Sequence, residues 1–359
     1  MIKYIIKKIL YSLLILWGVI SVIFILFNVL PGDPAQLMLG QRSDQKSVEL
    51  INKDLGLDQP LYLQYIKYLN DLSPISIHNK INSESFFYFD SDHYSGFAKL
   101  YFGGKSILVL KKPYLRRSFQ SKNSVSKIIR DTFINTLVLA FSSIVFASFI
   151  GILWGIFCAL FKNSVFDRIS VFLSAFGMSL PSFFAAILIG WLFAFVLHRF
   201  TNLNLTGNLY EIDDFGEGKI LQLKNLILPS VTLGIRPLSV VLQLTRNTLL
   251  ETLSKDYIRT AKAKGLPYRK IIYKHALKNS LSPVISAISG WFASMLAGVV
   301  FVEYIFGWKG LGFVIVNALN SYDLPVIMGC VLVISCMFII VNILVDIFYA
   351  FLDPRVRLS

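Results

Sequence analysis

The chain has 359 residues, of which 55% are hydrophobic, 14% aromatic and only 16% charged. Soluble domains carry roughly 25% charged residues, so this composition indicates a membrane protein and excludes an ordinary soluble domain. The formal net charge of +14 does not indicate a nucleic-acid partner, because membrane proteins retain Lys and Arg in their cytoplasmic loops.

Six apolar runs follow one another along the chain, each long enough to cross a bilayer, since a helix needs about 20 such residues. They are Ile9–Leu30, Thr132–Phe161, Ile169–Leu197, Leu226–Leu250, Asn279–Val302 and Leu324–Val345. The fourth run is interrupted by Arg236 and Arg246. We nevertheless assign it as a span, because the chain must return to the side of the membrane that carries the next basic loop. The predicted fold class is an all-α membrane protein of six transmembrane helices, with an extracytoplasmic insert between the first two.

Basic residues in the short loops orient these helices. The three lysines of the amino terminus, the loop Phe161–Arg168, the loop 251–280 and the tail residues Arg355 and Arg357 all fall on one side of a six-span arrangement. The positive-inside rule places that side in the cytoplasm. We therefore expect both termini to be cytoplasmic in a multi-pass protein of the cytoplasmic membrane.

The chain divides into three parts: 1–30 as an amino-terminal transmembrane helix, 31–127 as an extracytoplasmic domain, and 128–359 as a five-helix core. The extracytoplasmic part is polar. Apolar residues at helical spacing on both sides of the phrase "LGLDQP" predict two short helices, the first near Val48 to Ile51 and the second near Leu61 to Leu69. A tethered irregular loop is the alternative for this part.

The loop 251–280 carries eight Lys and Arg residues between two apolar runs. Within it, "SKDYIRTAKAKGLP" predicts a short helix of about three turns, with Ser254 and Asp256 as candidate N-caps and Gly265 as its end. Such a helix lies either on the membrane surface or in a groove of another protein. The small residues Ala261, Ala263 and Gly265 favour the protein groove, because a lipid-seeking helix is typically rich in Trp, Phe and Leu.

Seven phrases, in order along nearly the whole chain, resemble the dipeptide and oligopeptide branch of binding-protein-dependent ABC transporter permeases. Besides "DYIRTAKAKG" with "KHALKNSLSPV", they are "LPGDPA", "LGLDQPLYLQYIKYL", "SLPSFF", "IFGWKGLG", "DLPVIMG" and "NILVDIFYAFLDPRVR". The chain departs from the general permease pattern at Thr260, Lys262 and Pro283. The later proline is typical of the peptide branch.

This resemblance implies an inner-membrane permease subunit that takes up di- or oligopeptides and has no catalytic site of its own. It implies a second homologous permease, two cytoplasmic ATPase subunits that use ATP, and an extracytoplasmic substrate-binding protein as partners, with no cofactor bound by this chain. The short helix would be the coupling helix that sits in a cleft of an ATPase subunit. The matching residues are Asp256, Tyr257, Arg259, Thr260, Ala261, Lys262, Ala263 and Gly265. Nickel or glutathione as cargo, and a homodimer or heterodimer of permeases, stay open.

A polar stripe runs along the fourth predicted span. Arg236, Ser239, Gln243 and Arg246 recur at i, i+3, i+7 and i+10 and share one helical face. Because a charge inside the bilayer is costly unless it faces protein or water, we interpret Arg236, Ser239 and Gln243 as part of the substrate pathway, with Arg236 contacting the peptide. The alternative is that Arg236 pairs with a neighbouring subunit or reaches outward to the interface.

Two further sets of residues repeat at every fourth position and predict close helix packing. They are Ala147, Gly151, Gly155 and Ala159, and Ser286, Gly290, Ser294 and Gly298. One ridge is expected to pack inside the chain and the other against the partner permease. The alternative is that both pack internally.

Other function classes find little support. The spacing of the three cysteines and four histidines matches no metal site, and no nucleophile motif occurs, so neither a membrane enzyme nor a metal centre is indicated. An ion-coupled carrier usually has acidic groups in mid-membrane. Here Glu303 and Asp346 are expected near the ends of their spans, in reach of interfacial water.

Overall fold

The computed structural model of the chain describes residues 2–29, 49, 52, 57–81, 85–89, 94, 96–100, 106–212 and 218–352. These residues form two units. The first comprises Met1–Ser12, Thr132–Phe313 and Ile334–Ser359, and the second comprises Leu13–Asp131 and Val314–Val333. Each unit has a hydrophobic core of its own.

Among the described residues, four helices are long and apolar enough to cross a membrane: α1 (Ile2–Val29), α5 (Val125–Leu160), α9 (Lys224–Leu253) and α14 (Leu324–Leu352). Two bent pairs raise this to six if each pair is one span. The first joins α6 (Val165–Ser179) to α7 (Ser182–Ile189) and η2 (Gly190–Val196). The second joins the run α11 (Tyr268–Lys270), η3 (Ile271–Ala276) and the first part of α12 (Leu277–Ile305) to the end of α12. These helices account for the mostly helical membrane fold that the apolar runs predict.

The predicted span Ile169–Leu197 is not one straight helix. The axes of α6 and of α7 with η2 differ by 114°. The break falls at Leu180 and Pro181, which are both extended, with ψ angles of 127° and 140°. Proline lacks the N–H that a continuous helix needs and disfavours a helical residue before it, so the phrase "SLPSFF" encodes the bend.

The ridge of small residues on α5 packs inside the first unit. A Cβ added at Gly155 would lie 2.6 Å from the carbonyl oxygen of Leu242 on α9, and one at Gly151 would lie 3.0 Å from that of Leu238. The ridge on α12 differs, because a Cβ at Gly290 or Gly298 would meet nothing within 4 Å. The α5 ridge therefore serves internal packing, whereas the glycines of the α12 ridge have no close neighbour among the described residues.

The turn from α12 into α13 (Leu311–Asn320) is held by buried polar contacts. The Trp308 indole donates to the carbonyl of Asn135 at 2.9 Å, and the Leu311 N–H donates to the Thr136 hydroxyl at 2.8 Å. The expectation that Glu303 reaches interfacial water is wrong, since its side chain is fully buried. Its carboxylate accepts the Gly312 N–H at 2.6 Å, so it compensates the positive end of the α13 dipole instead. The phrase "IFGWKGLG" is thus the sequence of this turn.

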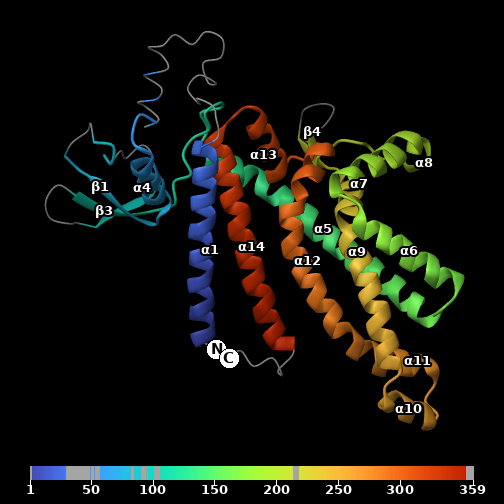
Figure 1. Cartoon of the computed structure of the whole chain (residues 1–359). Coiled ribbons are helices and arrows are strands. Elements are labelled where there is room, and N and C mark those ends of the chain that lie inside the picture. The colour runs from blue at the N-terminus through green and yellow to red at the C-terminus, as the bar shows by residue number, and fades with distance from the viewer. Residues whose placement is uncertain are drawn as a thin grey trace. The chain divides into compact units, whose positions relative to one another are not determined.

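Asp346 of α14 forms an ion pair with Lys8 of α1, within the first unit. In that unit the beginning of α1, the end of α14 and the helix α10 (Asp256–Ala263) lie at the same end of the long helices (Figure 1). This placement agrees with the loop assignment made from charge. The tail residues Arg355 and Arg357 lie outside the described residues.

The insert lies in the second unit and contains strands that the sequence analysis did not predict. Its helix α4 (Leu61–Leu72) agrees with the second of the two predicted short helices, whereas the first lies outside the described residues apart from positions 49 and 52. After α4 come β1 (Ile75–Asn79), β2 (Phe97–Leu100) and β3 (Ser106–Lys111), which form an antiparallel sheet in the order β1-β3-β2. The strands are four to six residues long, so their period-two pattern is short and easily missed.

Buried Asp71 joins α4 to this sheet through its backbone carbonyl and to neighbouring loop residues through its carboxylate. The Tyr94 hydroxyl donates to the carboxylate of Asp71 at 3.1 Å, and Lys111 of β3 donates to the Asp71 carbonyl at 2.5 Å. Arg116 lies 3.6 Å from the same carboxylate. Burial lowers the pKa of Lys111, which Asp71 partly offsets. The insert is therefore a small folded domain with a charged centre.

Two further strands, β4 (Tyr210–Ile212) and β5 (Lys219–Leu221), form a hairpin in the first unit. They follow the short helix α8 (His198–Thr201) in the loop before α9.

Candidate functional site

The candidate site is built around α10, which begins directly after α9. Lys255 is the N-cap, in the extended conformation, and no side chain caps the helix. The prediction of Ser254 or Asp256 as N-cap is wrong, because the Ser254 hydroxyl donates backwards to the Glu251 carbonyl at 2.7 Å. Asp256 instead lies in the first turn, where its charge complements the helix dipole.

A glycine ends α10 as the sequence predicts. Gly265 has a φ of +73°, and the N–H groups of Leu266 and Gly265 donate to the carbonyls of Ala261 and Lys262 at 3.3 and 3.0 Å. This pair of bonds is a Schellman motif, which requires the left-handed conformation that glycine adopts without strain. The helix itself has eight residues, about two turns, and is shorter than expected.

The inner side of α10 is fixed to the ends of neighbouring helices. Ile258 is fully buried and Ala261 is 7% exposed. They belong to a hydrophobic cluster, the α10 seat, whose buried members are Ala159, Leu249, Ile258, Ala261, Ile271 and Ala276. The prediction that Ala261 faces a groove of another protein is therefore wrong, because its side chain packs inside this chain; a helix of this length must bury one face to be stable.

The outer side of α10 is exposed and basic. The exposed predicted site residues are Asp256, Tyr257, Arg259, Thr260, Lys262, Ala263 and Gly265. The continuing segment through α11 and η3 adds exposed Lys264, Tyr268, Arg269, Lys270, Tyr273 and Lys274. The ion pair between Asp256 and Arg259, at 3.3 Å, is solvent-exposed and contributes little to stability. The outer side thus presents positive charge and tyrosines without a large apolar patch.

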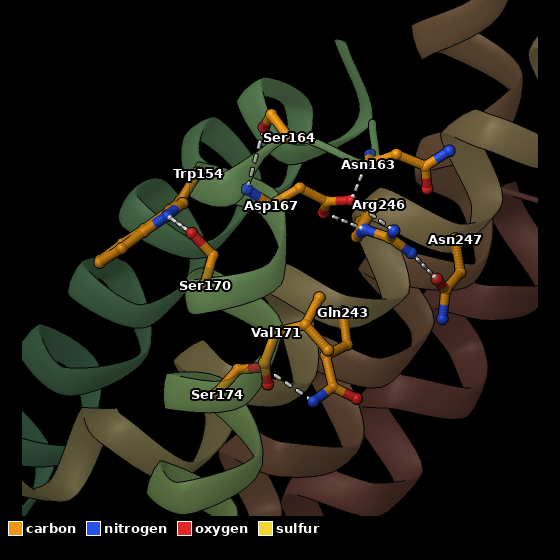
Figure 2. Close-up of polar contacts among 10 residues, drawn as sticks. All are labelled: Trp154, Asn163, Ser164, Asp167, Ser170, Val171, Ser174, Gln243, Arg246 and Asn247. Atoms are coloured by element: carbon orange, nitrogen blue, oxygen red, sulfur yellow. Dashed lines mark hydrogen bonds and ion pairs between the residues drawn. The ribbon is translucent and has the colours of Figure 1, made fainter. Parts of the chain in front are cut away.

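A polar seam joins α6 to α9 a few turns before α10 begins (Figure 2). The buried residues Asp167, Ser170, Ser174 and Gly177 recur on α6 at i, i+3, i+7 and i+10. This spacing matches that of the stripe on α9. The amide of Gln243 donates to the Ser174 hydroxyl at 2.8 Å, and a Cβ at Gly177 would lie 2.6 Å from the Ser239 hydroxyl. The polar side chains of the two stripes therefore hydrogen-bond and pack against each other across an antiparallel helix pair.

An ion pair is the strongest contact of the seam. Arg246 donates from Nε and Nη2 to the two carboxylate oxygens of Asp167, at 2.6 and 2.7 Å. The side chain of Asp167 is 3% exposed and that of Arg246 is 19% exposed. The backbone N–H of Asn163 donates to the same carboxylate at 2.9 Å, so the loop between α5 and α6 joins the seam. A bidentate pair of this kind fixes the rotation of both helices as well as their distance.

The seam corrects the predicted substrate pathway. Ser239 is 3% exposed and Gln243 is hydrogen-bonded to α6, so these two residues pack helices together and do not line an open path. Arg236 alone is exposed. The polar stripe of α6 is visible in the sequence at the same spacing as the stripe of α9, and comparing the two would have found the seam.

The whole chain resembles known transport proteins. A family model described as "Binding-protein-dependent transport system inner membrane component" matches residues 151–358, and a model for the N-terminal part of such components matches residues 1–83. The dipeptide transport system permease protein DppB of Alkalihalophilus pseudofirmus is 31% identical over 99% of this chain and 100% of its own length. The glutathione transport system permease protein GsiC of Escherichia coli K12 is also 31% identical, over 99% of both chains.

Two further comparisons agree. The probable D,D-dipeptide transport system permease protein DdpB of Escherichia coli K12 is 32% identical over 96% of this chain and 94% of its own length. Among solved structures, an inward-facing MetNI methionine ABC transporter matches 63% of this chain and 97% of its own, with a TM-score of 0.50 and 15% identity, which supports the fold alone. With a family model over more than half of its length and full-length relatives at this identity, the chain belongs to the inner-membrane permease components of binding-protein-dependent transport systems.

Proposed function

We propose that this permease subunit takes up di- or oligopeptides across the cytoplasmic membrane in an ATP-driven ABC importer. The similarity to a dipeptide permease and to a probable D,D-dipeptide permease supports this cargo class. Glutathione is the second candidate, because a glutathione permease is equally similar, and glutathione is itself a peptide. Nickel lacks such support among these relatives.

The proposed complex contains two permease subunits, two cytoplasmic ATPase subunits and an extracytoplasmic binding protein. ATP is used by the ATPase subunits, and this chain binds no cofactor and hydrolyses nothing. The glycines of the α12 ridge, which have no close neighbour in the part of the chain that the structure describes, fit a helix contact with the second permease. Both termini are cytoplasmic and lie on the same side as α10, which the basic loops support.

The observation that carries the proposal is the division of α10 into a buried and an exposed side. Ile258 and Ala261 fix the helix to α5, α9 and η3, whereas the basic outer side is free to enter a cleft of an ATPase subunit. A displacement of α10 therefore moves α9 with it. The Asp167–Arg246 pair passes that movement to α6, which is the first part of the bent span. This is a rigid route from an ATPase cleft to the membrane helices.

Arg236 is the proposed substrate contact that the structure leaves exposed. Its guanidinium is suited to the carboxylate or the carbonyl groups of a peptide in a low-dielectric path. An Arg236→Gln variant should assemble normally and raise the peptide concentration needed for half-maximal uptake. Unchanged uptake kinetics would remove Arg236 from the pathway.

Reconstitution of the complete complex in liposomes tests the function. We expect ATP-dependent uptake of labelled dipeptide, loss of uptake in the variant Arg259→Glu/Lys262→Glu, and normal uptake in the exposed control variant Arg199→Glu. Glutathione and Ni²⁺ are offered in parallel to identify the cargo. Uptake that continues without ATPase subunits and collapses with the ion gradient would instead show a secondary carrier.

A further inference from the structure

The insert carries an apolar surface on the open face of its sheet. Residues on this face are paired across the strands: Ile75 with Leu110, Ile77 and Leu100 with Leu108, and Ala98 with Leu110. Ile75, Ile77, Leu100 and Leu110 are 57, 59, 47 and 47% exposed. We call these six residues the open sheet face.

The polar residues Ser76, His78, Lys99 and Lys111 point the other way, whereas the paired Asn79 and Ser106 lie on the open side at one end of the strands. Ser76, His78 and Lys111 are buried on the covered face, beside Ile107 and Val109. An antiparallel sheet that borders water has its apolar side chains on the covered face and its polar ones outside. Apart from the pair Asn79–Ser106, this sheet has aliphatic side chains on its open face, which indicates that the face does not border water.

The position of α4 along α1 indicates that this face lies beside the membrane. The apolar window of α1 runs from Leu10 to Phe27. The Tyr65 hydroxyl of α4 hydrogen-bonds to the Ser21 hydroxyl at 2.6 Å, and its ring lies 5.1 Å from that of Phe24. At 1.5 Å per residue, Ser21 lies about 9 Å before the end of the window.

The helix α4 therefore lies alongside the span of α1 and not beyond it (Figure 1). Its outward residues Leu61, Tyr62 and Ile66 are 53, 65 and 48% exposed. Exposed Tyr and aliphatic side chains at this depth are typical of the interfacial belt of a membrane protein. They continue the apolar surface of α1 towards the sheet.

The free edge of β1 supports the same placement. Along β1, the backbone N–H and C=O groups of every second residue point away from β3. At Ile77, Ile75 and Asn79, both of these groups are hydrogen-bonded within the insert. Asn70 of α4 accepts from the Ile77 N–H and donates to the Ile77 carbonyl, both at 2.9 Å. The Ser73 hydroxyl bonds the Ile75 N–H at 3.2 Å and its carbonyl at 2.6 Å.

The third residue, Asn79, donates to the Phe87 carbonyl at 2.8 Å and accepts from the Phe89 N–H at 3.0 Å. An edge strand in water needs no such partners, since water supplies them, whereas lipid supplies none. The exposed residues Lys80 and Lys112, which follow β1 and β3, bracket the open sheet face with positive charge. That arrangement suits the phosphates of anionic lipids.

We infer that the open sheet face and the outward side of α4 are immersed in the outer leaflet, at the boundary between acyl chains and headgroups. This inference rests on the proposed topology, in which the end of α1 is extracytoplasmic. The insert is then an interfacial anchor for the outer half of α1. The alternative is that the same surface binds the extracytoplasmic binding protein, and this result would overturn the inference.

Spin-label accessibility in the full complex tests the inference. Single cysteines replace Ile77, Leu110 or Tyr62 in a background where Cys158, Cys330 and Cys336 are alanine. The complex is placed in bilayers of phosphatidylethanolamine and phosphatidylglycerol. Trp17, in the α1 window, is the lipid control, and the exposed residue Asn123 is the water control. Collisions of the label with O₂ and with a water-soluble Ni(II) chelate are compared.

We expect the labels at Ile77 and Leu110 to collide more with O₂ than with Ni(II), as at Trp17, and saturating binding protein to leave this ratio unchanged. Collision ratios like that at Asn123 would place the face in water and overturn the inference. Protection from both reagents that appears only with binding protein would show a protein docking surface. ATP-driven uptake, measured on the same samples, separates either failure from a failure of the proposed function.

Discussion

The ion pair between Asp167 and Arg246 should be the most costly contact to remove from the seam. An Asp167→Asn variant keeps the shape of the side chain but removes its charge and turns one of its two acceptor oxygens into an NH2 donor, so Arg246 loses one of its two bonds to this side chain and keeps the bond to Asn247 at 3.1 Å. Breaking a buried pair by neutralising one partner costs about 3–5 kcal/mol. Because Arg246 is partly exposed, we expect the lower end of this range, about 3 kcal/mol.

The matched control is Ser174→Ala, which removes the neutral bond to Gln243 in the same seam. Hydrogen bonds between membrane helices average about 0.6 kcal/mol in double-mutant cycles. The free energy of unfolding is measured by titration of mixed micelles with sodium dodecyl sulfate. An Arg246→Met variant and the double variant complete a cycle, with an expected interaction energy of about 1.5–3 kcal/mol.

The same variants should separate ATP hydrolysis from transport. If the seam passes movement from α10 to α6, Asp167→Asn raises the ATP hydrolysed per peptide taken up, whereas Ser174→Ala leaves that ratio near the wild-type value. A cost for Asp167→Asn no greater than that for Ser174→Ala, with unchanged coupling, would refute the reasoning.

Three further predictions concern packing, pH and the α12–α13 turn. Gly155→Ala should lower the free energy of unfolding by about 1–3 kcal/mol, because the added Cβ would lie 2.6 Å from the Leu242 carbonyl oxygen. Burial, reinforced by Lys111, lowers the pKa of His78 to about 4. The stability that neutral His78 contributes to the insert is therefore full above pH 6.5 and is lost as the pH falls towards 4, by at most about 3 kcal/mol. Glu303→Ala should cost about 1–3 kcal/mol through the buried N–H groups left unpaired, and Glu303→Gln less.

Each of these has its own control. Gly290→Ala, which meets no atom within 4 Å, should leave the stability of the isolated chain unchanged, and an equal loss there would show that packing is not the cause. Hydrogen exchange of β1 measures the pH effect, and a His78→Gln variant should flatten its profile; a steep profile in that variant would assign the effect elsewhere. Equal losses for Glu303→Ala and Glu303→Gln would show that the carboxylate charge, rather than hydrogen bonding, stabilises the turn.

Hydropathy and charge predicted the spans because lipid imposes a long apolar run on every crossing helix. They missed the 114° break at Pro181, since an apolar run continues across it unchanged. The break was nevertheless readable from the Leu-Pro pair, which disfavours helix on both sides. The sheet of the insert was missed because its strands are short and β3 carries apolar residues on both faces, which removes the alternation of apolar and polar residues.

The site was predicted in part. The α10 helix and its end at Gly265 follow from local sequence, because a Schellman motif depends on neighbouring residues only. The burial of Ala261 depends on contacts with α5, which is distant in sequence, and with η3, which follows the turn at Gly265. The local sequence pattern of α10 therefore does not determine it. Ser239 and Gln243 were assigned to the substrate pathway because the polar stripe of α9 was interpreted without the matching stripe of α6.

Cysteine cross-linking at α10 tests most directly whether its outer side contacts an ATPase subunit. Ala261 and Ala263 are the same residue type two positions apart, but Ala261 is buried in the α10 seat and Ala263 is exposed. In the complete complex without native cysteines, we expect Ala263→Cys to cross-link to an ATPase subunit through a short bismaleimide, and Ala261→Cys to remain unreactive. Absence of any ATPase cross-link from Ala263→Cys, in a complex that still takes up peptide with ATP, would contradict the proposed coupling.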